Sequence, residues 1–378
     1  MIPAANIYYL LCYAWDWMEG QALVDVDAVP SDNVQDLLGL ALAEGTSRLL
    51  RLGIDRAYIA VQEEGRTPRG KIAIGECVNR CLHERGLVAY VADELSPDVL
   101  HNQLLAATIG RLARANVDPR VTWKLRQVAR RFPLVSAIEP APTLFRRVQL
   151  HRHNASYRFL LNLCELILGH LLPEGRTGAF RFHDFRANAQ EMGLLFQEFV
   201  RNFLTREQHH FSVTAETVPW DVATEEPSQL QWLPRMQTDV SLVAPGRKVV
   251  IEVKYPANLF QTAFGGNPKL HSAHLYQLLS YLKNLEARGG THATATGVLL
   301  YASAGQPLDL RYKIAGHGVL VRAVDLTRHW QEIRHDLLAL IADVMHQGGD
   351  QRELLTRVRS SAHTPRLLYG CRPTIRDI

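Results

Sequence analysis

The sequence predicts an α/β fold, in which a central mixed sheet is flanked by helices and is preceded by a mixed α+β N-terminal domain. Short apolar runs rich in β-branched residues alternate with segments whose apolar residues recur at helical spacing. Helices before and after such strands are typical of an α/β core. The chain of 378 residues is also long enough for two domains, each with its own core.

Residues 1–150 are expected to form the N-terminal domain. Periodicity predicts helices at Ile7–Met18 and Val34–Leu52, and alternation with β-branching predicts a strand at Arg56–Gln62. The segment Arg111–Arg131 is basic, and several of its cations share one helix face. That face either lies in solvent above its own core or contacts DNA or a partner. The cations include Arg120, Lys124, Arg126, Arg130 and Arg131.

Residues 151–346 are expected to hold the α/β core, and residues 347–378 to form a basic tail that is partly disordered or docks a partner. Prolines mark the connection between the first two zones: Pro133, Pro140 and Pro142. Helices are predicted before the sheet, and further strands of sheet-interior composition follow it. These elements are Ser156–Leu172, Gln190–Arg206, Gly297–Tyr301 and Gly318–Val324.

The segment Met236–Tyr255 contains the most informative pattern in the chain. Its two apolar strands are joined by a Pro-Gly turn, and on the second strand Glu252 and Lys254 share a face because they are two residues apart. If the strands pair, Asp239 joins them at one end of the sheet. Two carboxylates and a lysine suit Mg²⁺-dependent phosphodiester hydrolysis, whereas an exposed hairpin with an ion pair is the alternative. The apolar setting favours a site, because buried charges are costly without compensation.

The following helix, Ser272–Glu286, provides a second element. Gln277 and Tyr281 lie on one face, four residues apart, so they either orient a ligand beside the strands or are ordinary helix residues.

Other site classes are disfavoured. Gly65–Lys71 begins like a phosphate-binding loop, but Ile72 stands where a Ser or Thr should hold Mg²⁺, so this loop is a candidate partner contact instead. The sequence Cys77, Cys81, His83 lacks a fourth zinc ligand. A net charge of +4 permits contact with DNA without requiring it. Scattered cysteines, with no visible signal peptide or membrane span, indicate a cytoplasmic protein.

The strand motif follows the PD-(D/E)xK nuclease pattern, and the chain resembles McrC, the nuclease subunit of McrBC-type modification-dependent (5-methylcytosine) restriction systems. The resemblance covers most of residues 2–345 in the family's order. The segments that carry it are IPAANIYYLLCYAW, GAFRFHDFRANAQEMGLLFQEF, LPRMQTDVSL, IEVKY, HSAHLYQLLSYL and YKIAG.

This resemblance implies a Mg²⁺ site and names its residues. It assigns catalysis to Asp239, Glu252, Lys254, Gln277 and Tyr281, and metal binding to Asp239, Glu252, Val253 and Gln197. Many family members carry a glutamate on the helix before the sheet where this chain has Gln197. The adjacent Glu198 is turned about a quarter of the way round that helix.

The resemblance also implies the partners. These are modified duplex DNA and a GTP-hydrolysing AAA+ McrB-type ring, which docks on residues 1–150, carries the recognition of the modified base and is stimulated by this chain. A double-strand break would need two nuclease domains or two successive events. Two alternatives stay open: a free-standing metal-dependent nuclease, and a non-catalytic factor that activates an AAA+ partner.

Overall fold

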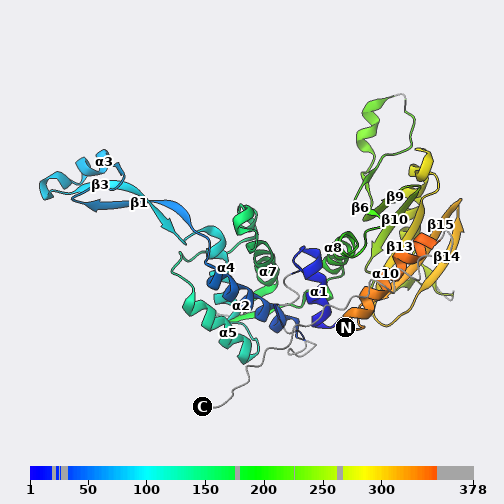
Figure 1. Ribbon diagram of the computed structural model, residues 1–378, viewed down its shortest axis with the longest axis horizontal. Helices are drawn as coiled ribbons and strands as arrows, with labels where there is room; N and C mark the ends of the chain where they lie inside the picture. Colours follow the sequence, from blue (N-terminus) through cyan, green and yellow to red (C-terminus); the bar gives the residue numbers. More distant parts are fainter. Residues whose placement is uncertain are drawn as a thin grey trace, which may run out of the picture.

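The computed structural model describes residues 1–18, 23, 24, 26, 33–174, 179–224, 226–261 and 267–346. They form three parts in a row, which Figure 1 shows as a projecting β arm, a helical domain and a sheet domain. The expected basic tail, residues 347–378, lies outside the described residues. Among the helices described, none is both long and apolar enough to span a bilayer.

The helical domain consists of amphipathic helices that bury their apolar faces together. The basic segment between Arg111 and Arg131 is divided between two helices, because Asp118 accepts a hydrogen bond from Arg120 N at 2.7 Å and caps a new helix at Pro119. The elements are α2 (Val34–Leu52), α4 (Leu100–Leu112), α5 (Pro119–Arg131), α6 (Pro142–Phe145), η4 (Arg152–Asn154), α7 (Tyr157–His170), β4 (Leu171–Glu174) and β5 (Ala179–Phe182).

The β arm, residues 56–96, is a long antiparallel hairpin that leaves the helical domain (Figure 1). Its strands pair from Ala57 opposite Ser96 to Gly65 opposite Val88. The arm exposes apolar side chains near its tip, with Ile74 71% and Val78 63% exposed. Its elements are β1 (Ala57–Gly65), β2 (Lys71–Ile72), α3 (Ile74–Asn79), η3 (Leu82–Arg85) and β3 (Val88–Ser96).

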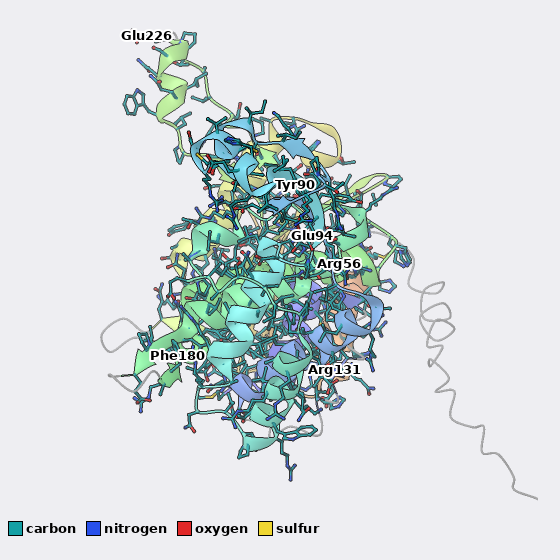
Figure 2. The ribbon with its side chains drawn as sticks, turned by 90° about the vertical axis from the view of Figure 1, so that its left-hand side faces the viewer. Arg56, Tyr90, Glu94, Arg131, Phe180 and Glu226 are labelled. Carbon is teal, nitrogen blue, oxygen red and sulfur yellow. The ribbon has the colours of Figure 1, made fainter. Side chains whose placement is uncertain are left out.

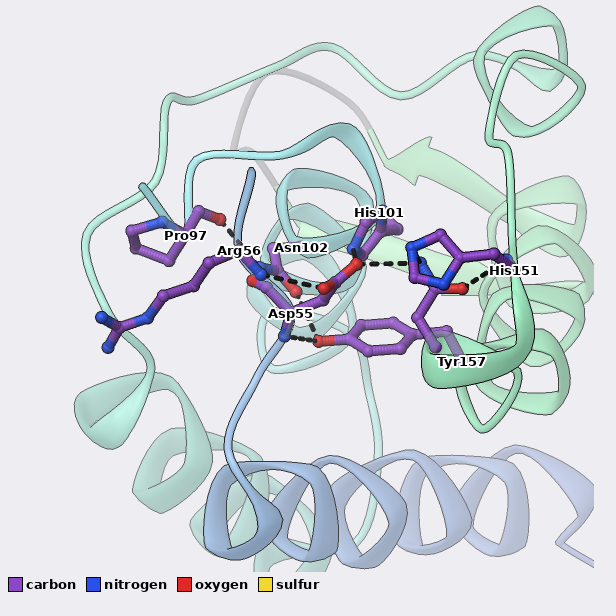
Figure 3. Close-up of polar contacts among 8 residues, drawn as sticks. Asp55, Arg56, Pro97, His101, Asn102, His151 and Tyr157 are labelled. Atoms are coloured by element: carbon purple, nitrogen blue, oxygen red, sulfur yellow. Dashed lines mark hydrogen bonds and ion pairs between the residues drawn. The ribbon is translucent and has the colours of Figure 1, made fainter. Parts of the chain in front are cut away.

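A polar network holds the root of the arm, as Figure 3 shows. The Asp55 carboxylate lies 3.0 Å from His101 Nε2 and accepts a hydrogen bond from Asn154 Nδ2 at 2.8 Å. Tyr157 accepts from Asp55 N at 2.9 Å and donates to Asn102 Oδ1 at 2.8 Å. Burial lowers the pKa of His101. Because these partners come from α4 and α7 and the segment between them, the arm leaves the domain in a fixed direction.

The sheet domain contains a six-stranded mixed sheet in the order β14-β15-β13-β10-β9-β6. The strands β10, β13 and β15 run parallel, and the outer pairings are antiparallel. This confirms the predicted fold class. The ladder consists of β6 (Ser212–Thr214), β9 (Val240–Ala244), β10 (Arg247–Lys254), β13 (Thr296–Ser303), β14 (Asp309–Ile314) and β15 (His317–Asp325).

Alternate side chains of β10 pack against helices on opposite faces of the sheet. Val250 packs with Leu278 and Leu282 of α9, whereas Val249 and Ile251 belong to a core shared with helices on the other face. The helices are α1 (Ala4–Ala14), α8 (Ala189–Glu207), α9 (Ser272–Glu286) and α10 (Trp330–His346). The remaining elements are η5 (Phe185–Ala187), β7 (Thr217–Val218), η6 (Pro227–Trp232), β8 (Met236–Gln237), β11 (Phe260–Gln261), β12 (Lys269–Leu270) and η7 (Gly290–His292).

The packing crosses the boundary expected at residue 150. From α1, Asn6 donates to Leu326 O at 2.7 Å and Tyr9 stacks on Trp330 at 4.9 Å, so the first helix is joined to the sheet domain. Conversely, α7 follows residue 150 in the chain but packs against α2 and α4 in the helical domain. One core cluster therefore runs through both domains, and a second, separate cluster lies between α9 and the sheet.

Candidate active site

Three of the predicted site residues meet where β9 begins and β10 ends: Asp239, Glu252 and Val253. The two strands are joined by the Pro245-Gly246 turn, in which Gly246 has φ 73°. Their register pairs Val240 with Ile251, so the next step along the ladder places Asp239 opposite Glu252. Asp239 Oδ2 accepts a hydrogen bond from the main-chain N–H of Val253 at 2.8 Å.

The two carboxylates lie in an environment that disfavours their charge. Glu252 is 0% exposed, and burial followed by the negative charge of Asp239 raises its pKa to about 7. Burial also raises the pKa of Asp239. Glu252 Oε2 is buried without a hydrogen-bond partner among the described residues. A buried carboxylate oxygen that faces a second carboxylate is an arrangement that a hard divalent cation would stabilise.

Lys254 is held by a chain of hydrogen bonds from α9. Its Nζ lies 2.6 Å from Glu252 Oε1 and donates to Gln277 Oε1 at 2.9 Å. Gln277 Nε2 donates to the Tyr281 hydroxyl at 2.9 Å, and that hydroxyl donates to Gln237 O at 3.0 Å. Tyr281 is only 5% exposed. The helix predicted to lie beside the strands therefore orients the lysine.

The helix α8 passes the same end of the sheet on its other face. A Cβ added to Gly193 would lie 3.8 Å from Tyr255 Cβ, and the positive charge of Arg201 partly opposes the rise in the pKa of Asp239 that burial causes. Gln197 lies four residues after Gly193 and four residues before Arg201, so it occupies the helix face that is turned toward the strand ends. Its side chain makes no hydrogen bond within the described chain, and Glu198 forms an ion pair with Arg201.

These residues can supply part of the coordination sphere of Mg²⁺. Asp239 and Glu252 offer carboxylate oxygens, whereas Val253 has an apolar side chain and could contribute only its carbonyl. No cluster of three His, Cys, Asp or Glu side chains suited to a metal occurs in the described residues, Cys77 and Cys81 included. Two carboxylates, supplemented by carbonyl, amide, water and phosphate oxygens, suit Mg²⁺ rather than a structural zinc.

His274 belongs to the same environment and was not anticipated from the sequence. Its Nδ1 lies 3.1 Å from the Tyr301 hydroxyl, and Tyr301 pairs with Lys254 in the sheet. Burial, with the charge of Lys254 adding to it, lowers the pKa of His274 to about 4. The sequence signal was its position three residues before Gln277, which places both on one face of α9.

Comparison with known proteins identifies the family. Residues 5–302 match the family described as "McrBC 5-methylcytosine restriction system component". The chain is 28% identical over 346 residues to the type IV methyl-directed restriction enzyme EcoKMcrBC of Escherichia coli (strain K12), covering 91% of this chain and 99% of that protein. Its fold resembles a chain of the Thermococcus gammatolerans assembly of McrB AAA+ hexamers with bound McrC, with a TM-score of 0.57 and 16% identity. That alignment covers 90% of this chain and 76% of the other. The chain therefore belongs to the McrBC family of 5-methylcytosine restriction system components.

Proposed function

We propose that this chain is the Mg²⁺-dependent endonuclease subunit of a GTP-driven restriction complex that cuts modified duplex DNA. The observation that carries the proposal is the fully buried Glu252, with one oxygen on Lys254 and the other without a partner in the described chain, opposite Asp239. Such an arrangement is costly in a protein that uses it only for structure.

In the proposed mechanism, Asp239 and Glu252 would hold a Mg²⁺ ion, which when bound would supply a more acidic water and neutralise charge on the phosphate. Lys254 places its ammonium group beside the same carboxylates, where it can orient the attacking water or stabilise the added negative charge. Gln277 and Tyr281 keep that ammonium group in one position. Each site would cut one strand, so a double-strand break needs two copies or two events.

We further propose that residues 1–150 dock on a McrB-type AAA+ ring through the β arm. The arm projects beyond the helical domain (Figure 1). It exposes apolar and basic residues around the loop between β1 and β2. The network at Asp55 fixes the direction of the arm. Recognition of the modified base would then lie in the partner, which agrees with the moderate charge of this chain.

The test is cleavage of a modified plasmid with Mg²⁺, the partner ring and GTP. Asp239→Ala should reduce cutting by roughly 100-fold or more, because it removes a charged metal ligand. Lys254→Ala should also stop cutting but leave Mg²⁺ affinity, measured by calorimetry, less affected. The matched control is Asp309→Ala, which removes an exposed carboxylate on β14. Wild-type cutting by Asp239→Ala would refute the proposal.

One observation favours a second candidate, a non-catalytic activator of the ring. Gln197 stands where many family members carry a glutamate, so a third metal ligand at this position would be neutral. Stimulation of the partner's GTP hydrolysis by wild type and by Asp239→Ala separates the two functions. Equal stimulation, together with an absence of cutting by the wild type under every condition, would favour the activator.

A further inference from the structure

The helical domain carries a positively charged surface that the proposed catalytic site does not use. The helix α5 contains five cations and no acidic residue, PRVTWKLRQVARR. It lies along the lower edge of the helical domain in Figure 1, away from the sheet domain, and Arg131 near its end is labelled in Figure 2.

The apolar face of α5 is fully used in packing. Val121, Leu125 and Val128 are buried against the rest of the helical domain, with Leu125 0% exposed. The apolar face is therefore unavailable for insertion into a membrane surface. The opposite face of the helix is exposed.

The exposed face has the chemistry of a site for a polyanion. At 100° per residue, Trp123 lies at its centre, with Arg126 and Arg130 on one side and Arg120 on the other. Trp123 is 62% exposed, although large aromatic side chains are usually buried. Here we define the α5 basic face as Arg120, Trp123, Arg126, Arg130 and Arg131.

The arginines of this face have no ion-pair partner among the described residues. Lys124, on the edge toward α2, pairs with Glu44. Within the described residues, by contrast, the four arginines form neither an ion pair nor a side-chain hydrogen bond. Guanidinium groups without internal carboxylates are available for the bidentate contacts that phosphates accept.

We propose that the α5 basic face binds the phosphate backbone of duplex DNA. Four like charges around one indole, with no carboxylate partner in the described residues, suit the closely spaced phosphates of duplex DNA, which is therefore the occupant that we choose. Over the 13 residues of α5 the helix spans about 20 Å, enough to reach several phosphates of a duplex. The contact carries no sequence information, so it would hold DNA without selecting it.

The experiment measures binding of a fluorescein-labelled, unmodified 30-base-pair duplex to full-length Asp239→Ala protein in EDTA, by anisotropy at several salt concentrations. Removing two phosphate contacts with Arg126→Ala/Arg130→Ala should lower the slope of log affinity against log salt by about 1.8. Between about 50 and 200 mM salt, wild-type binding should therefore weaken about 12-fold more than binding by the variant. Trp123→Ala should weaken binding with little change in slope, because it removes no charge.

The matched control is Arg181→Ala/Arg311→Ala, which lowers the net charge equally. Both control arginines are exposed, like Arg126 and Arg130, but Arg181 pairs with Glu174, and Arg311 pairs with Asp309 and Asp343. Circular dichroism should show that all variants are folded like the Asp239→Ala protein, since every further residue that is changed is exposed. A slope that is unchanged in the α5 variant, or lowered equally by the control pair, would overturn the proposal. So would unaltered DNA binding with loss of binding to the partner ring, which would make α5 a protein contact. None of these outcomes depends on cleavage.

Discussion

Glu252 makes the stability of the metal-free protein depend on pH. Its pKa is raised from 4.5 to about 7, first by burial and then by Asp239. A carboxyl with a higher pKa in the folded than in the unfolded chain binds its proton more tightly when folded, so the free energy of unfolding falls as pH rises between these values. Each pH unit corresponds to about 1.4 kcal/mol, which gives a loss of about 3 kcal/mol above pH 7.

The variant Glu252→Gln removes this ionisation but keeps the side-chain volume and an oxygen acceptor for Lys254. Urea unfolding in EDTA at about pH 5 and pH 8 should show that the variant loses about 3 kcal/mol less stability than the wild type over this interval. Added Mg²⁺ should restore wild-type stability at the higher pH and affect the variant much less.

Asp309→Asn provides the control, because Asp309 is half-exposed and pairs with Arg322 at the outer strand. It should unfold with the same pH dependence as the wild type. If Glu252→Gln retained the full wild-type pH dependence, the carboxyl would not carry the buried charge that the geometry assigns to it.

Three further outcomes are expected. Tyr281→Phe removes the hydroxyl that binds Gln237 O and receives the Gln277 amide, so it should lower stability by about 1 kcal/mol and slow cutting without loss of Mg²⁺ binding. Asp55→Ala breaks the network at the arm root and should reduce stimulation of the partner's GTP hydrolysis more than ring binding; equal losses in both assays would contradict a positioning role. Gly297→Val should lower the melting temperature, since a Cβ there would meet Leu282 Cδ1 at 2.8 Å; a stability loss below about 1 kcal/mol would show that α9 can move away.

The geometry of the site could be anticipated because it depends on local periodicity. Strand alternation placed Glu252 and Lys254 on one face, and helical spacing paired Gln277 with Tyr281. The bounds of α2 and α9 also agree with the sequence interpretation, since their apolar stripes and ends lie within one segment. Only the turn between β9 and β10 was needed to bring Asp239 to the other carboxylate.

The rest depended on contacts between distant segments. The edge strand β14 and the helix α10 were missed, although α10 buries Leu337 and Leu340 against the sheet. The attachment of α1 to α8 could not be read from its apolar run, which does not specify a partner. The place of His274 became evident only when β13 brought Tyr301 beside it.

The attachment of α1 to the sheet domain and of α7 to the helical domain has a mechanical consequence. The backbone passes from the sheet domain to the helical domain after α1 and returns before α8, while the shared core fills the junction. Two covalent connections and a continuous core resist rotation far better than a single hinge. If a ring held the β arm, it would therefore move the helical domain and the sheet domain together as one rigid body. The length of that body would set the distance along DNA at which Asp239 and Glu252 could reach a phosphate.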